Sequence, residues 1–199
     1  MNIQEPAVSL RAVAHADVAE MTEMMVRNRA DVERVGPANA DGFFTEAGMS
    51  RRIDEVLDES ARGLRHQWII RVDGVLAGDI GLSHIQRGPL QNANLGYMVD
   101  VAFRGRGVAT AAVRLATELA FGEVGLHRLE AGVMPSNVGS QRVLEKAGFT
   151  RVGITRSLLF IAGRWEDHIL YELVGPDTAP DMMSASEPAA ASPGEGTSG

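Results

Sequence analysis

A glycine-spaced basic loop at residues 104–109 is the part of the sequence best suited to bind a phosphorylated ligand. It consists of Arg104, Gly105, Arg106, Gly107, Val108 and Ala109. Because glycine lacks a Cβ, the loop can turn tightly and its backbone can approach a ligand closely. Apolar side chains then recur every three or four positions over 108–121, which predicts a helix. The free N–H groups and the dipole of a helix N-terminus favour an anion, so the loop predicts a pyrophosphate site.

Two other kinds of phosphate loop do not fit these residues. A nucleoside-triphosphate loop ends in Gly-Lys-Ser/Thr, whereas the chain's only lysine, Lys146, is far from the loop in sequence. A dinucleotide fingerprint needs a third glycine where Thr110 stands. The remaining interpretations are an Arg-x-x-Gly-x-Ala loop, formed by Arg104, Gly107 and Ala109, or a surface turn rich in glycine and arginine.

Three further motifs accompany the loop. Leu-Gly-Tyr-Met-Val at 95–99 precedes it, and Asn137-Val-Gly-Ser140 with Glu-Lys-Ala-Gly-Phe at 145–149 follows it. Gly-Arg-Trp-Glu-Asp-His occupies 163–168. Together with the loop, and over about residues 8–174, these motifs resemble those of the GNAT superfamily of N-acetyltransferases. Within it they resemble the RimJ and RimL type, which acetylates the N-termini of ribosomal proteins.

The resemblance implies an α+β fold, a GNAT fold with a mixed, mostly antiparallel central sheet of about seven strands and about four flanking helices. Two parallel strands would splay apart to form the cleft for coenzyme A (CoA). Acetyl-CoA would be the cosubstrate, with no metal. Backbone groups of Met98 and Val99 would hold the pantetheine arm and the thioester carbonyl, and the amides of 104–109 the pyrophosphate. Asn137 would contact the pantetheine amides, cap a helix, or do both.

The implied reaction is the attack of an amine on a thioester, and it needs a neutral amine, donors for the oxyanion and a proton for the thiolate. An α-amino group titrates near pH 8 and a lysine side chain near 10.4, so N-termini suit a site with a weak base. The expected acceptor is therefore a protein or peptide N-terminus. A small-molecule amine, such as an antibiotic, is the alternative, and a non-catalytic CoA-binding module is a third hypothesis.

The catalytic residues depart from the pattern of many GNAT enzymes. Leu144 stands where a tyrosine acid is common, seven residues after the asparagine, and Gly132 stands where a related branch has a glutamate base. Ser140 is the RimJ/RimL-type substitute that would protonate the thiolate, although a serine at a helix start also serves as an N-cap. Glu130, on the same strand face as position 132, would polarise water or be a surface carboxylate.

The expected acceptor pocket draws on residues from several strands: His84, Tyr97, Trp165 and Asp167. His84 would lie beside the strand that carries Met98, as an outside candidate for a base. Trp165 is otherwise expected in the core. His84 shows no metal-ligand spacing with the other strand histidines, His127 and His168.

These side chains need a framework of alternating strands and helices. Strand patterns occupy 8–13, 67–72, 75–85, 94–99, 127–133, 151–160 and 165–173, and helix patterns occupy 16–29, 45–62, 108–121 and 138–147. Asp73-Gly74 and Ala162-Gly163 mark hairpin turns. A helix joins strands 94–99 and 127–133, which should therefore be parallel neighbours. Methionines 21, 24, 25 and 49 are expected in the core or as pocket fillers.

Composition agrees with one intracellular enzyme domain at 1–174 and an acidic tail at 175–199. The chain has no cysteine, no apolar run of the roughly 18 residues that a membrane span needs, and no secretory signal. Four of its acidic residues and none of its basic ones lie in the tail, which is rich in Pro, Ala, Ser and Gly and is expected to be disordered. The net charge of −7 disfavours nucleic-acid binding. We expect a cytoplasmic protein with no membrane partner, and a homodimer remains open.

Overall fold

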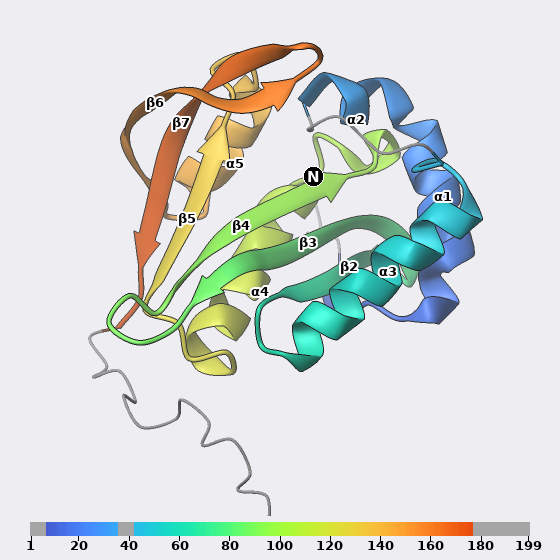
Figure 1. Cartoon of the computed structure of the whole chain (residues 1–199), viewed down its shortest axis with the longest axis horizontal. Helices are drawn as coiled ribbons and strands as arrows, with labels where there is room; N and C mark the ends of the chain where they lie inside the picture. Colours follow the sequence, from blue (N-terminus) through green and yellow to red (C-terminus); the bar gives the residue numbers. More distant parts are fainter. Residues whose placement is uncertain (1–6, 36–41, 177–199) are drawn as a thin grey trace, which may run out of the picture.

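The computed structural model describes residues 7–35 and 42–176, which form a seven-stranded sheet with helices on both faces (Figure 1). The strands are β1 (Val8–Ala12), β2 (His66–Val72), β3 (Val75–Gln86), β4 (Asn92–Val99), β5 (Arg128–Val133), β6 (Thr150–Ile161) and β7 (Arg164–Val174). The α-helices are α1 (Val18–Arg27), α2 (Arg29–Val35), α3 (Glu46–Ala61), α4 (Val108–Gly122) and α5 (Val138–Lys146), with short 3₁₀ turns η1 (His15–Asp17) and η2 (Val101–Phe103). The predicted α+β fold class is confirmed.

The sheet is mixed, with one parallel pair in the order β1-β2-β3-β4-β5-β7-β6. The parallel pair is β4 and β5, as predicted from the helix that joins them. Its register covers only Asn92 to Asn94 against Arg128 to Glu130. Beyond that point β4 continues to Val99 and β5 to Val133 without pairing to each other, so the two strands diverge and leave a gap in the sheet.

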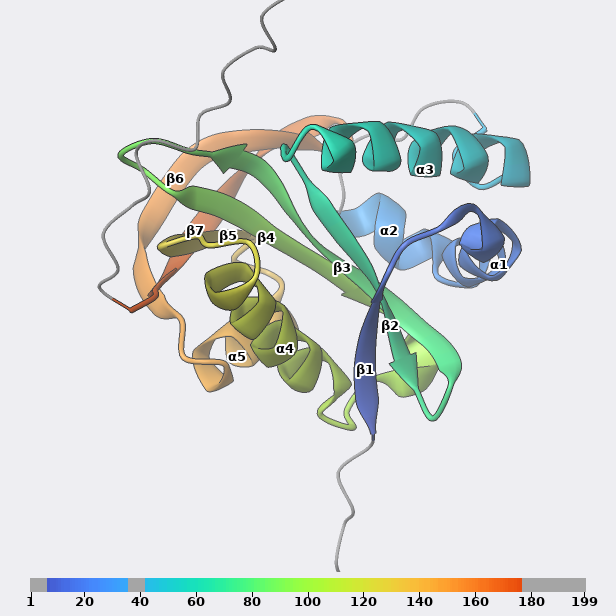
Figure 2. The same cartoon turned by 90° about the horizontal axis from the view of Figure 1, so that it is seen from below.

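Helices cover the two faces of the sheet with separate apolar cores. Helices α1, α2 and α3 lie on one side, and α4 and α5 on the other (Figure 2). The larger core joins α4 to the sheet through Val113, Ala116 and Ala120, which are fully buried. The smaller core holds the predicted methionine cluster of α1 and α3: Met21, Met24, Met25 and Met49. Both helical faces follow the apolar spacing of the sequence.

The segment predicted as one helix at 16–29 and a following loop is instead three pieces, η1, α1 and α2. The chain breaks at Asn28, whose side-chain amide donates to the carbonyl of Met24 (2.8 Å) while its oxygen accepts from the amide of Val101 (2.9 Å). A side chain that bonds to backbone in this way competes with helix continuation. Helix α2 follows directly, so the described residues contain five α-helices where about four were expected.

The C-terminal end of the described chain stays attached to the sheet. The amide of Gly175 donates to the carbonyl of His127 (2.7 Å), and the His127 ring nitrogen Nδ1 lies 3.3 Å from the carbonyl of Pro176. The rest of the expected tail, 177–199, lies outside the described residues. In the part of the chain that the structure describes, no helix is long and apolar enough to span a membrane.

Candidate functional site

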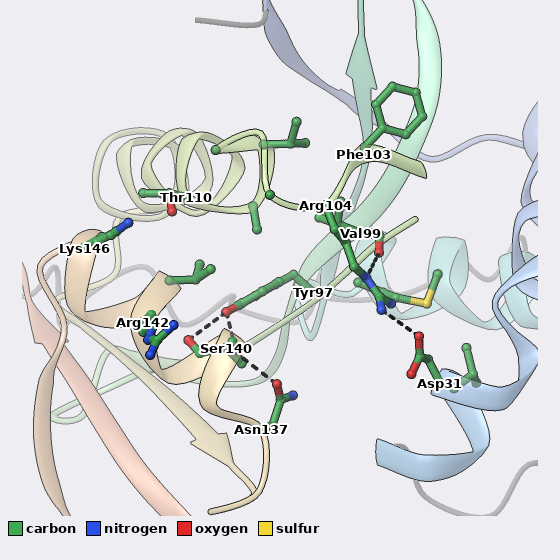
Figure 3. A pocket seen from close by; sticks show the side chains of 18 of the residues that line it. Asp31, Tyr97, Val99, Phe103, Arg104, Thr110, Asn137, Ser140, Arg142 and Lys146 are labelled. Carbon is green, nitrogen blue, oxygen red and sulfur yellow. Dashed lines mark hydrogen bonds and ion pairs between the residues drawn. The ribbon is translucent and has the colours of Figure 1, made fainter. Parts of the chain in front are cut away.

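The glycine-spaced loop turns into helix α4 through two residues with left-handed backbone. Gly105 has φ +72° and Gly107, the N-cap of α4, has φ +82°. A Cβ at either position would meet no atom within 4 Å, so glycine is favoured by backbone conformation and not by packing. The amides that open a helix lack intrahelical partners, and in α4 they belong to Val108, Ala109 and Thr110, which line a cavity (Figure 3).

This cavity has a volume of about 480 Å³ and lies where the glycine-spaced loop, the diverging end of β4, helix α2 and helix α5 meet. Tyr97, Met98 and Val99 of β4 form one wall. The remaining lining residues are Asp31, Val32, Arg34, Phe103, Arg104, Gly105, Gly107, Val108, Ala109, Thr110, Asn137, Gly139, Ser140, Arg142, Val143 and Lys146. The cavity therefore connects the anion-binding end of α4 with Asn137 and Ser140 at the start of α5.

Positive charge dominates the cavity walls. Arg104 donates to one carboxylate oxygen of Asp31 (2.6 Å) and Arg34 to the other (2.9 Å). These hydrogen bonds, from Arg34 and then Arg104, hold the pKa of Asp31 below its usual range. Arg142 and Lys146 lie across the cavity from this cluster (Figure 3). Four cations against one carboxylate suit a ligand with several negative charges.

A buried carboxylate anchors the turn that leads into the loop. Asp100 is fully buried and accepts from Arg27 Nε (3.0 Å) and Nη2 (2.6 Å), and from the amide of Ala102 (3.0 Å). Asn28 accepts from the amide of Val101. The end of α1 thus fixes the segment immediately before the loop, which keeps the loop in place relative to the sheet.

The end of β4 is held in position from the opposite side by β3. Gly78 pairs with Val99, and a Cβ at Gly78 would lie 2.1 Å from the carbonyl oxygen of Met98. Only glycine allows this close approach. Because the β4–β5 register ends at Asn94, this end of β4 has no pairing with β5. The Met98 carbonyl faces Gly78 of β3, and the Val99 carbonyl accepts from Arg104 Nε (3.4 Å).

Ser140, Tyr97 and Asn137 form one hydrogen-bonded group at the start of α5 (Figure 3). Asn137 caps the helix by accepting from the amide of Ser140 (3.2 Å). The Tyr97 hydroxyl lies 2.8 Å from Ser140 Oγ and 3.3 Å from the Ser140 carbonyl oxygen. Burial raises the pKa of Tyr97 to about 12, against a smaller opposing effect of its hydrogen bond to Ser140. Tyr97 is therefore protonated at neutral pH and can donate to Ser140.

A second, smaller cavity lies on the other side of this group, in the gap between β4 and β5. Its volume is about 160 Å³. It shares Tyr97, Asn137 and Ser140 with the larger cavity and is also lined by Gly132 and the buried His168. Its other walls are Leu95, Gly96, Ala131, Val133, Met134 and Leu144. The Tyr97–Ser140 pair thus separates the two cavities.

Comparison with known proteins identifies the family. The model of the acetyltransferase (GNAT) domain matches residues 8–150, which include the loop, the diverging strands and Ser140. The chain belongs to the GNAT family of acetyltransferases. Its sheet, with one parallel pair among antiparallel strands, is the fold that the sequence motifs predicted.

Named relatives of this GNAT chain are N-acetyltransferases. A probable N-acetyltransferase, YjcK of Bacillus subtilis, is 40% identical over 172 residues, which cover 85% of this chain and 95% of the relative. The ribosomal protein uS5-alanine N-acetyltransferase of Escherichia coli is 31% identical over 173 residues, which cover 86% of this chain and 89% of the relative.

Solved structures show the same fold. The ribosomal-protein-S5-alanine acetyltransferase of Vibrio fischeri has a TM-score of 0.82 at 27% identity, over 87% of this chain and 96% of that chain. RimJ of Mycobacterium smegmatis, solved in complex with CoA-disulfide, has a TM-score of 0.81 at 28% identity, over 84% of this chain and 81% of that chain. The predicted resemblance to the RimJ/RimL type is confirmed.

Several residues predicted for the site lie outside both cavities. Glu130 accepts from Arg128 Nε (2.9 Å), and Arg128 also pairs with Glu172. His84 is exposed, with φ +52°, in the irregular part of β3, and its ring contacts Ser83. Neither side chain lines either of the two cavities.

The hairpin of β6 and β7 also differs from the expectation. Trp165 was expected in the core, but it is 63% exposed and packs edge-on against Phe160, at 5.6 Å between ring centroids. It lies directly after the Ala162-Gly163 turn between β6 and β7. Asp167 accepts from the amide of Ser157 (2.8 Å) and thereby holds the irregular part of β6. Both lie outside the two cavities.

The cavity lining also differs from the predicted cofactor set. Arg106 does not line the cavity, and its guanidinium lies 5.8 Å from the ring centroid of Phe103. Lys146 is far from the loop in sequence and was not predicted as a cavity residue, but it does line the cavity, together with Arg142. Their four-residue spacing on α5 places both on one helical face, and this signal was available in the sequence.

Proposed function

We propose that this protein uses acetyl-CoA to acetylate the α-amino group of a protein or peptide N-terminus. The observation that carries the proposal is the 480 Å³ cavity, which joins the N-terminus of α4 to the Ser140–Tyr97 pair. One end is built to bind phosphate, and the other offers a hydroxyl that can donate a proton. The GNAT relatives with ribosomal-protein specificity support the same acceptor class.

The cavity residues fit acetyl-CoA in charge and shape. The open space at Gly105 and Gly107 leaves room for a pyrophosphate against the amides of α4. Arg142 and Lys146 supply charge for the third phosphate of the nucleotide. The pantetheine arm would lie along β4 at Met98 and Val99, where β4 does not pair with β5, with Asn137 as a further partner. Bound acetyl-CoA supplies the activated acetyl group.

Ser140 is the proposed proton donor to the leaving sulfur. In the reaction a C–N bond forms, the C–S bond breaks, the nitrogen loses a proton and the sulfur gains one. Ser140 lines both cavities, and its hydroxyl is oriented by the 2.8 Å contact with the protonated Tyr97. A serine hydroxyl on its own is a weak acid, so positioning next to the sulfur and the adjacent Tyr97 hydroxyl would provide its activity.

An N-terminal amine is the preferred acceptor on chemical grounds. At neutral pH a much larger fraction of an α-amino group than of a lysine side chain is already neutral. Within the described residues, no carboxylate other than Asp31 lines either cavity, and Asp31 is occupied by Arg34 and Arg104. A site of this kind favours an amine that is partly deprotonated in solution.

The test is a rate measurement across matched acceptors. Free thiol release from acetyl-CoA would be followed with peptides that begin in Ala, Ser or Met. The same peptides with a blocked N-terminus and an internal lysine serve as controls, together with a panel of small amines. The proposal predicts transfer to free N-termini and a rate at least tenfold lower on the blocked peptides. Transfer only to small amines would contradict the proposed acceptor, and an absence of all transfer would contradict catalysis.

A further inference from the structure

We propose that His168, through water in the smaller cavity, accepts the proton that the amine nitrogen loses during acetyl transfer. The inference rests on the proposed function for its chemistry, but it starts from a buried side chain that this function leaves unused. His168 is only 3% exposed, although histidine is polar, and it lines the same cavity as Ser140 and Tyr97. A polar side chain buried in this way normally has its hydrogen bonds satisfied.

The surroundings of His168 fix which ring nitrogen carries the proton. Its Nδ1 lies 3.1 Å from the backbone carbonyl oxygen of Glu166. A carbonyl can only accept, so Nδ1 donates and carries the hydrogen in the neutral ring. Nε2 is then left with a free lone pair. A neutral imidazole in this tautomer can accept a proton at Nε2.

The absence of a side chain at position 132 exposes the imidazole to the cavity. A Cβ at Gly132 would lie 3.7 Å from His168 Cδ2 and 3.8 Å from its Cβ, so the ring lies directly beside this glycine. Gly132 and His168 line the same 160 Å³ space as Ser140. At about 30 Å³ for each water, this volume accommodates a few molecules. Hydroxyl, amide and imidazole groups provide the polar partners that buried water requires.

Among the described residues that line the smaller cavity, no acidic or basic side chain faces the imidazole of His168. Among described residues, β4 presents Tyr97 to the cavity, β5 presents Gly132, and α5 presents Ser140. From β6, Thr155 is the register partner of His168 and is uncharged. On its own strand, Glu166 offers only its carbonyl to the ring, because its carboxylate pairs with Arg164.

His168 and Ser140 together can move the proton that the amine loses to the sulfur that leaves. The neutral amine attacks the thioester carbon, and the C–N bond forms as the carbonyl electrons move to oxygen. The nitrogen releases one proton through water to His168 Nε2. Collapse restores the carbonyl and breaks the C–S bond, while Ser140 gives its proton to the sulfur. The His168 proton then returns through cavity water to Ser140 Oγ, so the enzyme ends in its starting state.

His168→Asn tests this assignment while preserving the local hydrogen bond. The asparagine amide nitrogen stands where Nδ1 was, so it can still donate to the Glu166 carbonyl, but asparagine cannot accept a proton at neutral pH. We expect kcat to fall on the order of 10²-fold, at the lower end for a general base, with an unchanged dissociation constant for acetyl-CoA. His127→Asn is the matched control, because His127 lies at the sheet end beside Pro176 and should retain normal turnover. Normal kcat in folded His168→Asn would overturn the proposal.

Two further measurements separate proton transfer from packing, and the second does not depend on the peptide acceptor. His168→Ala leaves space beside Gly132, so added imidazole should restore acetyl transfer to a peptide N-terminus above the rate of His168→Ala without imidazole, after subtraction of the enzyme-free rate. In ¹⁵N-histidine NMR spectra, His168 should show the Nδ1–H tautomer at neutral pH. An Nε2–H tautomer, or no restoration by imidazole, would overturn the assignment. A wild-type protein that acetylates no N-terminal peptide would instead contradict the proposed function alone.

Discussion

Replacement of Ser140 by alanine separates a catalytic hydroxyl from a structural one, because the structure assigns the helix cap to another residue. Asn137 accepts from the backbone amide of Ser140, and that amide remains in Ser140→Ala. The variant loses only the 2.8 Å contact between Oγ and Tyr97. The Tyr97 hydroxyl keeps the Ser140 carbonyl as an acceptor at 3.3 Å. We therefore expect the free energy of unfolding to fall by only about 0.5–1.5 kcal/mol.

The kinetic loss should be larger than this stability loss. A general acid contributes on the order of 10² to 10⁴ in rate. At about 1.36 kcal/mol for each factor of ten, this corresponds to roughly 2.7–5.4 kcal/mol of transition-state stabilisation. Because the interaction forms mainly as the thiolate leaves, the dissociation constant of acetyl-CoA should change little.

The assay combines thiol-release kinetics, calorimetric binding of acetyl-CoA and thermal melting on the same preparations. Ser60→Ala is a suitable control, since Ser60 lies on α3 and lines neither cavity. The expected pattern is a low kcat with near-normal affinity and melting. A kcat within a few-fold of wild type in folded Ser140→Ala would refute the role of Ser140. If the melting temperature falls and kcat falls only in proportion to the loss of folded protein, Ser140 has a structural role instead.

Four other perturbations test the site. Gly107→Asp should abolish acetyl-CoA binding in calorimetry, whereas Gly74→Asp, at the same φ of +82° and also in open space, should not. Asp31→Asn should tighten acetyl-CoA binding about twofold to tenfold at low salt and less at high salt, because it removes the one carboxylate that lines the cavity among the described residues. Asp100→Ala should lower the free energy of unfolding by about 1–3 kcal/mol in urea titrations, because Arg27 and the amide of Ala102 lose their buried acceptor. Burial raises the pKa of Tyr97 from its unfolded value near 10 to about 12. The free energy of unfolding that this difference contributes is complete below about pH 10 and is lost as the pH rises toward about 12. Between about pH 10 and 12, wild type should therefore lose stability relative to Tyr97→Phe in urea titrations.

The parts of the site that lie close together in the sequence were predictable. The loop at 104–109 combines glycines, a helix start and an apolar stripe, and each of these is a local signal. Helix α4 begins at Val108, where the pattern placed it. The parallel β4–β5 pair followed from the connecting helix, since such crossovers join parallel neighbours.

The contacts across the gap were not predictable from local patterns. Tyr97 and Ser140 are separated by 43 residues, and they meet only because β4 and β5 diverge beyond Asn94. No sequence spacing encodes that divergence. His168 is next to the core residue Ile169 in β7, so its side chain points to the opposite face of the sheet. That this face carries a small cavity beside Gly132 depends on the neighbouring strand β5, which the local sequence of β7 does not report.

Helix α2 and Trp165 show two different reasons for error. Residues 29–35 are short, mostly polar and adjacent to Gly36-Pro37, so their pattern indicates a loop. In the structure, Asp31 on α2 bonds to Arg104, a tertiary contact that no local signal reports. Trp165 was expected in the core as a large aromatic residue, but it lies beside a hairpin turn and is 63% exposed.

The most direct test of the central claim is mass spectrometry of one peptide after incubation with the protein and acetyl-CoA. The peptide would carry a free N-terminal alanine and one internal lysine, so that both amines compete in the same molecule. The account predicts a single added acetyl group on the α-nitrogen, located by fragmentation, with wild-type protein and its near absence with Ser140→Ala. Acetylation of the lysine instead, or equal product with both proteins, would contradict it.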